Sequence, residues 1–216
     1  MKNRYSDILI VLGLLIVISS LLYIQKVDKR MTAKKIEIEK SKNDFIEQIK
    51  LDKEKLEFSE ELVNIFNRDE NDEQDNNLIQ KEIGYIEIES LDLILPIYSD
   101  TSYKSLKDGV GIVEGTDTPS VNKNNTSVLA GHRGGYNGKE SFLNVDKLKK
   151  GDLIKIVEDK ELIYEVIEQE VIESTDWDRF TKEEDKSKLI LLTCHPYPIN
   201  DKRLIIKTKL IDSKNI

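Results

Sequence analysis

A run of seventeen residues without a charge, Ile8 to Ile24, restricts this chain more than any other feature. Its length is at the lower end of what crosses a bilayer as a helix, and basic residues flank it on both sides. A cleaved signal peptide is the alternative, but no small-x-small cleavage pattern follows the run. We therefore expect residues 1–25 to be an uncleaved membrane anchor. The flanking charges do not fix its orientation, because long domains translocate largely regardless of charge.

The next segment, residues 26–68, is rich in Lys and Glu and contains no Gly or Pro, which indicates a helix. Apolar residues recur every four or seven positions in one thin stripe, whereas a strong coiled coil needs both seam positions apolar. The segment is therefore expected to be a solvated stalk or a helix that lies against the following domain. Residues 69–80 begin with an acidic run (DENDEQDNN) and are expected to be a flexible linker.

From residue 81 onward the periodicity changes from helical to strand-like, and glycines separate short segments rich in Ile, Val and Leu. Seven or eight strands, with helical turns near residues 103–107 and 141–148, indicate a mostly β domain over residues 81–212 that forms a closed or nearly closed barrel. Pro96 interrupts one segment, which suits a sheet edge or a bend. The strand candidates are Tyr85–Glu89, Leu93–Tyr98, Ser127–Ala130, Leu153–Val157, Leu162–Ile172, Leu189–Thr193 and Leu204–Ile211.

The net charge of −8 and the single cysteine exclude several classes of protein. Binding to nucleic acid needs a basic patch, but Lys and Arg are scattered here, usually beside Asp or Glu. One cysteine rules out an intrachain disulfide. One Cys and two His could supply three zinc ligands, but no paired ligand spacing is present, so zinc is not expected.

Cys194 stands at the end of an apolar strand candidate in LILLTCHPYPINDKR, where a loop with two prolines begins. Catalytic residues often lie at such strand ends, where a rigid scaffold meets solvent. Free cysteine is also among the most buried residue types, so a structural thiol is an equal alternative on this segment alone. A base or a cation beside the thiol would make it a good nucleophile near pH 7.

Two residues could provide such a group. His132 ends its own strand candidate in SVLAGHRGG, although a lone histidine there is more often structural. Arg203 begins the strand after Cys194, and in an antiparallel hairpin it would lie opposite the cysteine on the same face, where a guanidinium can hold an oxyanion. An ordinary surface arginine is the alternative. His195 is the poorer candidate, because adjacent residues on an extended chain point to opposite faces.

Taken together, these segments resemble the sortase family of cysteine transpeptidases. The resemblance rests on Thr193-Cys194, with Arg203 downstream and a Gly-His pair at His132 upstream, and it extends in order over residues 83–211. GYIEIESLDLILPIY, GVGIVEGT and FLNVDKLKKGDLIKI resemble further segments of the family. TCHPYPINDKRL is similar to the pilus-assembling class C. A single N-terminal anchor, with no Asp-Pro-aromatic lid and no second membrane helix, resembles class A instead.

The resemblance implies an eight-stranded β-barrel with short helices, anchored in the membrane as a single-pass protein and held outside a Gram-positive cell. Cys194 would attack a sorting signal of the Leu-Pro-x-Thr-Gly kind in a surface protein or pilin, Arg203 would steady the oxyanion, and His132 would act as acid and base. An amine would resolve the thioester; a pilin lysine is favoured over a cell-wall precursor. No cofactor, metal or nucleic acid is implied. A cysteine protease and a non-catalytic membrane-tethered scaffold stay open as alternatives.

Overall fold

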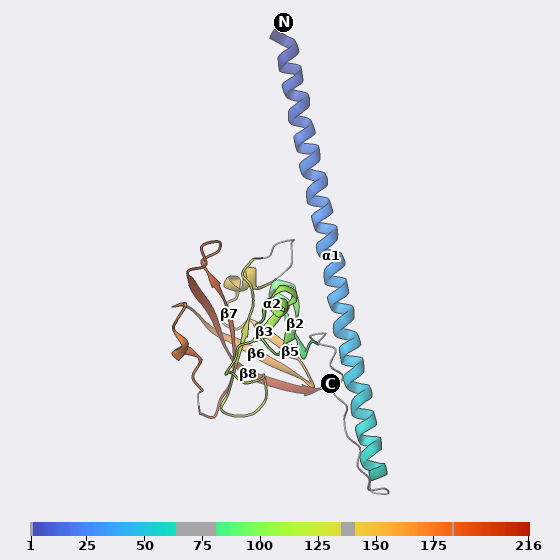
Figure 1. Cartoon of the computed structure of the whole chain (residues 1–216), viewed down its shortest axis with the longest axis vertical. Helices are drawn as coiled ribbons and strands as arrows, with labels where there is room; N and C mark the ends of the chain where they lie inside the picture. Colours follow the sequence, from blue (N-terminus) through green and yellow to red (C-terminus); the bar gives the residue numbers. More distant parts are fainter. Residues whose placement is uncertain (1, 64–80, 135–140, 183) are drawn as a thin grey trace. The chain divides into compact units, whose positions relative to one another are not determined.

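The computed structural model describes residues 2–63, 81–134, 141–182 and 184–216 (Figure 1). One long helix, α1 (Lys2–Val63), precedes the β domain. The chain divides into two compact units, Met1–Glu37 and Ile38–Ile216, so α1 contributes to both. The expected linker, residues 69–80, lies outside the described residues.

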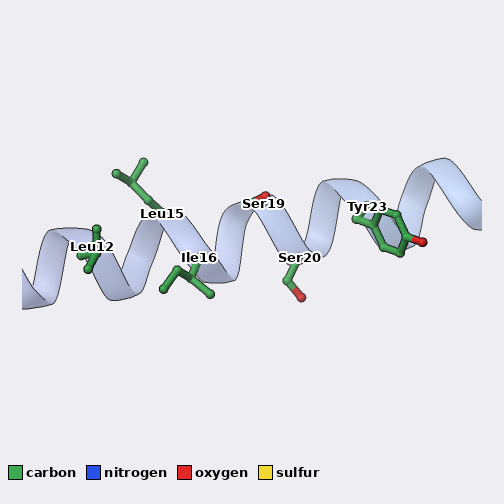
Figure 2. Close-up of a pocket in the computed structure, with 6 residues that line it drawn as sticks. All are labelled: Leu12, Leu15, Ile16, Ser19, Ser20 and Tyr23. Carbon is green, nitrogen blue, oxygen red and sulfur yellow. The ribbon is translucent and has the colours of Figure 1, made fainter.

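The first unit is the N-terminal part of α1. The large apolar side chains between Ile10 and Ile24 are exposed, and the helix is long and apolar enough to cross a membrane. A shallow depression along this helix is lined by side chains that are aliphatic or hydroxyl-bearing (Figure 2). An N-terminal helix that could span a membrane is thereby confirmed. The residues of Figure 2 are Leu12, Leu15, Ile16, Ser19, Ser20 and Tyr23.

The second unit contains a closed barrel of eight strands in the order β1-β2-β3-β4-β7-β8-β6-β5, which confirms the expected mostly β architecture (Figure 1). Most neighbours are antiparallel, but β2 and β3, and also β4 and β7, run parallel. The strands are β1 (Gly84–Ile88), β2 (Leu93–Tyr98), β3 (Val110–Ile112), β4 (Asn125–Ala130), β5 (Leu153–Val157), β6 (Lys160–Glu173), β7 (Ser187–His195) and β8 (Lys202–Asn215).

Short helical segments join the strands: η1 (Glu89–Leu91), α2 (Tyr103–Asp108), η2 (Phe142–Lys147) and η3 (Trp177–Phe180). Pro96 lies within β2 and is opposite Tyr85 of β1. On its other side β2 pairs with β3 only at Ile97 and Tyr98. Pro96 therefore occupies a part of β2 that is locally an edge, where the missing N–H of proline costs no ladder hydrogen bond.

Alternation along the strands separates two apolar clusters. All eight strands contribute to the main cluster, which fills the barrel; Leu189 and Leu191 are its members from β7. Ile190 and Leu192 of the same strand belong to a second cluster, so they face the outer side of the barrel wall. Phe180 of η3 packs against this outer cluster, whose other buried members are Val113, Val128, Ile172 and Ile205.

Within the second unit, α1 covers the outer face of β1. Ser41 hydrogen-bonds the hydroxyl of Tyr85 at 2.8 Å, and the ring of Phe45 meets the ring of Tyr85 edge-on at a centroid distance of 5.5 Å. Lys42 pairs with Glu87 at 2.6 Å. Of the two expected arrangements for this segment, the helix laid against the following domain is therefore the one seen around residues 41–45.

Candidate active site

Cys194 lies near the end of β7, between two neighbouring strands. β4 runs parallel to β7 on one side, and β8 runs antiparallel to it on the other. The thiol residue is half-buried, unlike the fully buried Leu191 and Thr193 that precede it. Because Cys194 follows Leu192 and Ile190 at intervals of two, it shares the outer face of β7 with them.

Arg203 is the register partner of Cys194 in the β7–β8 ladder. Directly opposite residues in an antiparallel pair project to the same face, so the guanidinium and the thiol share one side of the sheet. Nη1 of Arg203 donates hydrogen bonds to the backbone oxygens of Asn200 at 3.3 Å and Lys202 at 2.9 Å. The hairpin that the sequence predicted is therefore present, with the arginine held on the backbone of the loop before β8.

His132 comes two residues after β4, beside the end of β7. The parallel register pairs Ala130 with Leu192, and the N–H of Gly131 donates to the oxygen of Leu192 at 3.0 Å. The hydroxyl of Thr193 donates to the oxygen of Gly131 at 2.8 Å. Continuing the register of Ala130 and Leu192 by two residues brings His132 level with Cys194. The imidazole residue is exposed, so a substrate can reach it.

Cys194 and Arg203 thus lie on the neighbouring strands β7 and β8, and His132 follows the adjacent strand β4 at the same end of the barrel. His195 does not join them. Its Nδ1 lies 2.6 Å from Nη1 of Arg133, the residue that follows His132. Since adjacent residues alternate, the pair His132 and Cys194 faces one way and the pair Arg133 and His195 faces the other. The expectation that His195 points away from the thiol agrees with this contact.

Arg133 was not singled out by the sequence analysis. Its guanidinium is nearly buried and forms an ion pair of 2.6 Å with Asp146 of η2. One signal in the sequence could have revealed it: residues 132 and 133 must point to opposite sides, so an inward-facing arginine follows an outward-facing histidine. An inward-facing charge needs a partner, which makes a structural ion pair the expected outcome.

The outer apolar cluster continues the face on which Cys194 lies. Phe180 packs against it, and the ring of Trp177, which is 60% exposed, meets the ring of Phe180 at a centroid distance of 5.7 Å. Exposed aromatic surface on the same face of the barrel wall as the thiol can receive an apolar peptide side chain. Within the described ranges, no group of three or more His, Cys, Asp and Glu side chains is arranged to hold a metal ion.

Charged side chains near Arg203 are engaged in pairs of their own. Lys202 lies 2.7 Å from Glu173 across the β6–β8 ladder, and this hydrogen bond raises the pKa of the lysine. Lys207, further along β8, pairs with Glu168 and Glu170; although burial opposes its charge, these two carboxylates raise its pKa. Each of these lysines therefore stays an ammonium at neutral pH.

Comparison with known proteins decides the family. The model of the Sortase domain matches residues 86–211, which is more than half of the chain. The chain belongs to the sortase family. The matched range contains all eight strands apart from the first residues of β1 and the last of β8, together with His132, Cys194 and Arg203.

Individual sortases agree with this assignment. Sortase A of Bacillus anthracis is 31% identical over 183 residues, which cover 83% of this chain and 78% of the relative. Sortase D of Bacillus subtilis is 30% identical over 115 residues, so this chain spans about half the length of that relative. A sortase C of Streptococcus pneumoniae, described with its pilin substrate specificity, is 28% identical with a TM-score of 0.65; the match covers 82% of this chain and 100% of that chain.

The sortase family has a common chemistry. Sortases are cysteine transpeptidases that act on surface proteins or pilins with a sorting signal, and this chain has its single cysteine, Cys194, at the end of β7. Sortase relatives are membrane-associated, which agrees with a helix in this chain that could serve as an anchor.

Proposed function

We propose that this sortase cleaves a sorting signal of the Leu-Pro-x-Thr-Gly kind through a thioester on Cys194 and transfers the acyl group to an amine. The observation that carries this proposal is the register at one end of the barrel, where Arg203 is opposite Cys194 and the chain at His132 runs beside it. A nucleophile, an acid/base group and an oxyanion donor are the parts that acyl transfer through cysteine needs.

In the first half-reaction, the thiolate of Cys194 attacks the carbonyl carbon of the signal's threonine and forms a C–S bond. The guanidinium of Arg203 stabilises the negative charge that develops on the carbonyl oxygen. For this step Arg203 exchanges its contacts with the loop backbone for the oxyanion. When the peptide C–N bond breaks, the imidazolium of His132 gives its proton to the leaving glycine amine.

In the second half-reaction, the nitrogen of an acceptor amine attacks the thioester carbon, and the C–S bond breaks to release the thiolate. Neutral His132 takes the proton that the amine loses. The exposure of His132 and the half-buried position of Cys194 support this role, because the acceptor must reach both groups while the acyl chain occupies the site. The outer apolar cluster with Trp177 offers a surface for the apolar part of the signal.

For the acceptor we favour a lysine of a pilin. The loop TCHPYPIN supports this choice, as does the likeness to a sortase C that is described with its pilin substrate specificity. A cell-wall amine is the second candidate, and the 31% identity with a sortase A over most of the chain favours it. The two acceptors share the thioester and differ only in which amine resolves it.

We further propose that residues 1–25 anchor the chain, that residues 26–68 form a helical stalk, that residues 69–80 link it to the barrel, and that the catalytic domain of residues 81–212 lies outside the cell. The apolar surface of α1 from Ile10 to Ile24 supports the anchor. A membrane-impermeant thiol reagent should label Cys194 on intact cells. Labelling that requires lysis would put the barrel on the cytoplasmic side.

The function is tested with the full chain in detergent micelles and a Leu-Pro-x-Thr-Gly peptide. Intact mass should reveal an acyl adduct on the wild type that hydroxylamine removes, and the Cys194→Ala chain should form none. Adding a lysine-bearing pilin domain and a cell-wall peptide amine in competition identifies the acceptor. An adduct on the Cys194→Ala chain, or hydrolysis as the sole outcome with every amine, would refute the proposed transpeptidase activity. Product on the cell-wall peptide alone would leave anchoring of surface proteins as the activity.

A further inference from the structure

Arg133 has an unusual position for an arginine, since it directly follows the exposed His132 and its own side chain is only 6% exposed. Its Nη2 lies 2.6 Å from Oδ2 of Asp146. Its Nη1 lies 2.6 Å from Nδ1 of His195 and donates to the backbone oxygen of Cys194 at 3.5 Å. Because a guanidinium can only donate, this contact is a hydrogen bond in the tautomer of His195 whose Nδ1 accepts.

These partners belong to separate segments that surround the candidate site. Asp146 lies on η2, whereas His195 and Cys194 end β7. The segment that carries Arg133 is itself fixed on both sides: Gly131 accepts from Thr193, and His132 accepts from the N–H of Phe142 at 3.0 Å. The guanidinium therefore joins the loop after β4, the end of β7 and η2 at one point.

The close packing of the loop after β4 against the loop after β7 extends beyond this arginine. Gly134 has a φ of +95°, and a Cβ at this position would lie 2.5 Å from the ring of Tyr197. Glycine is thus required on two grounds, the left-handed backbone and the lack of space. His132 is held between these contacts, while its exposed ring receives little restraint from packing of its own.

We propose that Arg133 is a positioning residue for the transpeptidation proposed above, on which this inference rests. It ties the backbone beside His132 to the end of β7 through His195 and the backbone oxygen of Cys194, and to η2 through Asp146. In this way it keeps the imidazole beside the thiol. Rate depends steeply on such alignment, because a displacement of about 1 Å can cost roughly 10²-fold. The contribution of Arg133 to the reaction therefore passes through His132 rather than through contact with the substrate.

Arg133→Lys separates positioning from charge. Lysine keeps the cation but has no planar fork, so it cannot hold Asp146 and His195 together in their present places. We expect the rate of thioester formation at saturating peptide to fall by roughly tenfold to 10²-fold, with little change in KM, because alignment affects the transition state more than binding. A purely structural role would lower the melting temperature and leave the rate of the folded fraction unchanged.

The decisive experiment is a double-mutant cycle on the full chain in micelles, with single-turnover thioester formation followed by intact mass. Wild type, Arg133→Lys, His132→Ala and the double variant are compared. If Arg133 acts through His132, the double variant is no slower than His132→Ala. Losses that multiply, or an Arg133→Lys rate equal to wild type, would overturn the inference while leaving the transpeptidase intact. A wild type that forms no thioester would instead refute the proposed function itself.

A milder variant covers the case in which Arg133→Lys does not fold. Asp146 is 41% exposed, and Asp146→Asn removes the negative charge beside Arg133 while keeping a side-chain oxygen that can accept from the guanidinium. We expect it to slow thioester formation by about threefold to tenfold, again only where His132 is present. Its matched control is Asp185→Asn, which breaks an exposed pair of 2.8 Å with Lys123 before the start of β7. The control should react at the wild-type rate; equal losses in both aspartate variants would contradict the proposal.

Discussion

Polar side chains lie together at two places on the barrel, the outer face of β1 and the end of β7. The two places differ in how much of these side chains is exposed to solvent. On β1, Tyr85 is 1% exposed beneath α1, and Glu87 receives Lys42 at 2.6 Å and Lys155 at 3.0 Å. At the end of β7, His132 is exposed and Cys194 is half-buried. The first region presents its polar groups to the protein, and the second presents them to solvent.

This difference in solvent exposure affects the protonation of the ionisable groups in the two regions. Burial raises the pKa of Tyr85 to about 12, and a hydrogen bond from Ser41 only partly offsets it. Burial also opposes the charge on Glu87, but Lys42 and Lys155 outweigh it and lower the pKa of that carboxyl. Both groups therefore keep one protonation state near neutral pH and contribute to stability. Groups that exchange protons with a substrate need the open arrangement at β7. Changes at β7 should thus affect rate, and changes around β1 should affect stability.

The largest expected effect separates the two histidines at the β7 end. His132→Ala should slow thioester formation by about 10²–10⁴-fold, the usual contribution of one acid/base group. His195→Ala should cost less than about tenfold, because it removes only one partner of Arg133. Single-turnover rates by intact mass measure both, with melting temperatures as a check on folding. If His195→Ala were the slower chain, the assignment of His132 to the face of Cys194 would be wrong.

Arg203→Lys comes next in size. A lysine ammonium keeps the charge but lacks the planar set of donors that matches an oxyanion, so we expect a loss of roughly 10²-fold in thioester formation. Stability should be nearly unchanged, since the guanidinium donates to the backbone oxygens of Asn200 and Lys202, which lie next to it in the chain, and the backbone ladder of β8 does not depend on this side chain. Near-normal turnover would make Arg203 a surface residue and remove the oxyanion donor from the proposed mechanism.

The sequence predicted much of the architecture because strand alternation is a local signal. The barrel, the end of the strand at Cys194 and the hairpin that puts Arg203 opposite it all follow from alternation and turn residues near each other in the chain. Local patterns could not predict that His132 lies near Cys194, because β4 and β7 are parallel and some sixty residues separate the two. This pairing came from the resemblance to sortases.

The features that the sequence did not predict depend on contacts between distant segments. The sequence did not mark Arg133 as a site residue, because its burial depends on its contacts with Asp146 of η2 and with His195 at the end of β7. The alternation in YIEIE predicted a strand at Tyr85–Glu89, but it did not identify which of its residues α1 would cover. Glu158 stands in a turn between β5 and β6, where a charged residue is ordinarily solvated, yet its Oε1 is buried. Burial of this kind is a property of the assembled fold.

Glu158 should make the free energy of unfolding depend on pH, an effect that we do not expect from the residues at the end of β7. Burial raises its pKa to about 8, with a smaller contribution from the charge of Asp159. The folded chain therefore binds this proton more tightly than the unfolded chain. The stability that it contributes is complete below about pH 4.5 and is lost as the pH rises through about 8. Over this window the shift of the pKa from 4.5 to about 8 should lower the free energy of unfolding of the wild type by on the order of 5 kcal/mol.

Glu158→Gln removes the titration, so its unfolding free energy should depend less on pH between about 4.5 and 8 and should exceed that of the wild type at the upper end. Denaturant unfolding of the full chain in micelles at a series of pH values measures this. Glu168→Gln, which changes a surface carboxylate that pairs with Lys207, is the control and should keep the wild-type slope. A Glu158→Gln chain with the same slope as the wild type would show that this carboxyl is solvated.

The smallest expected effect tests whether the packing of α1 against β1 influences the reaction at the end of β7. Phe45→Ala removes the ring that meets Tyr85 edge-on at 5.5 Å and should lower the free energy of unfolding by about 1 kcal/mol, or the melting temperature by roughly 2–4 °C. Leu51→Ala is the matched control on the same helix, since Leu51 is 46% exposed and loses little contact. Because Phe45 lies against β1 and the reaction is proposed at the end of β7, both chains should form the thioester at the wild-type rate. A slower reaction in Phe45→Ala, with Leu51→Ala unaffected, would mean that the packing of α1 on β1 helps to align the site. Stability at β1 and chemistry at the end of β7 would then not be separate properties of the barrel.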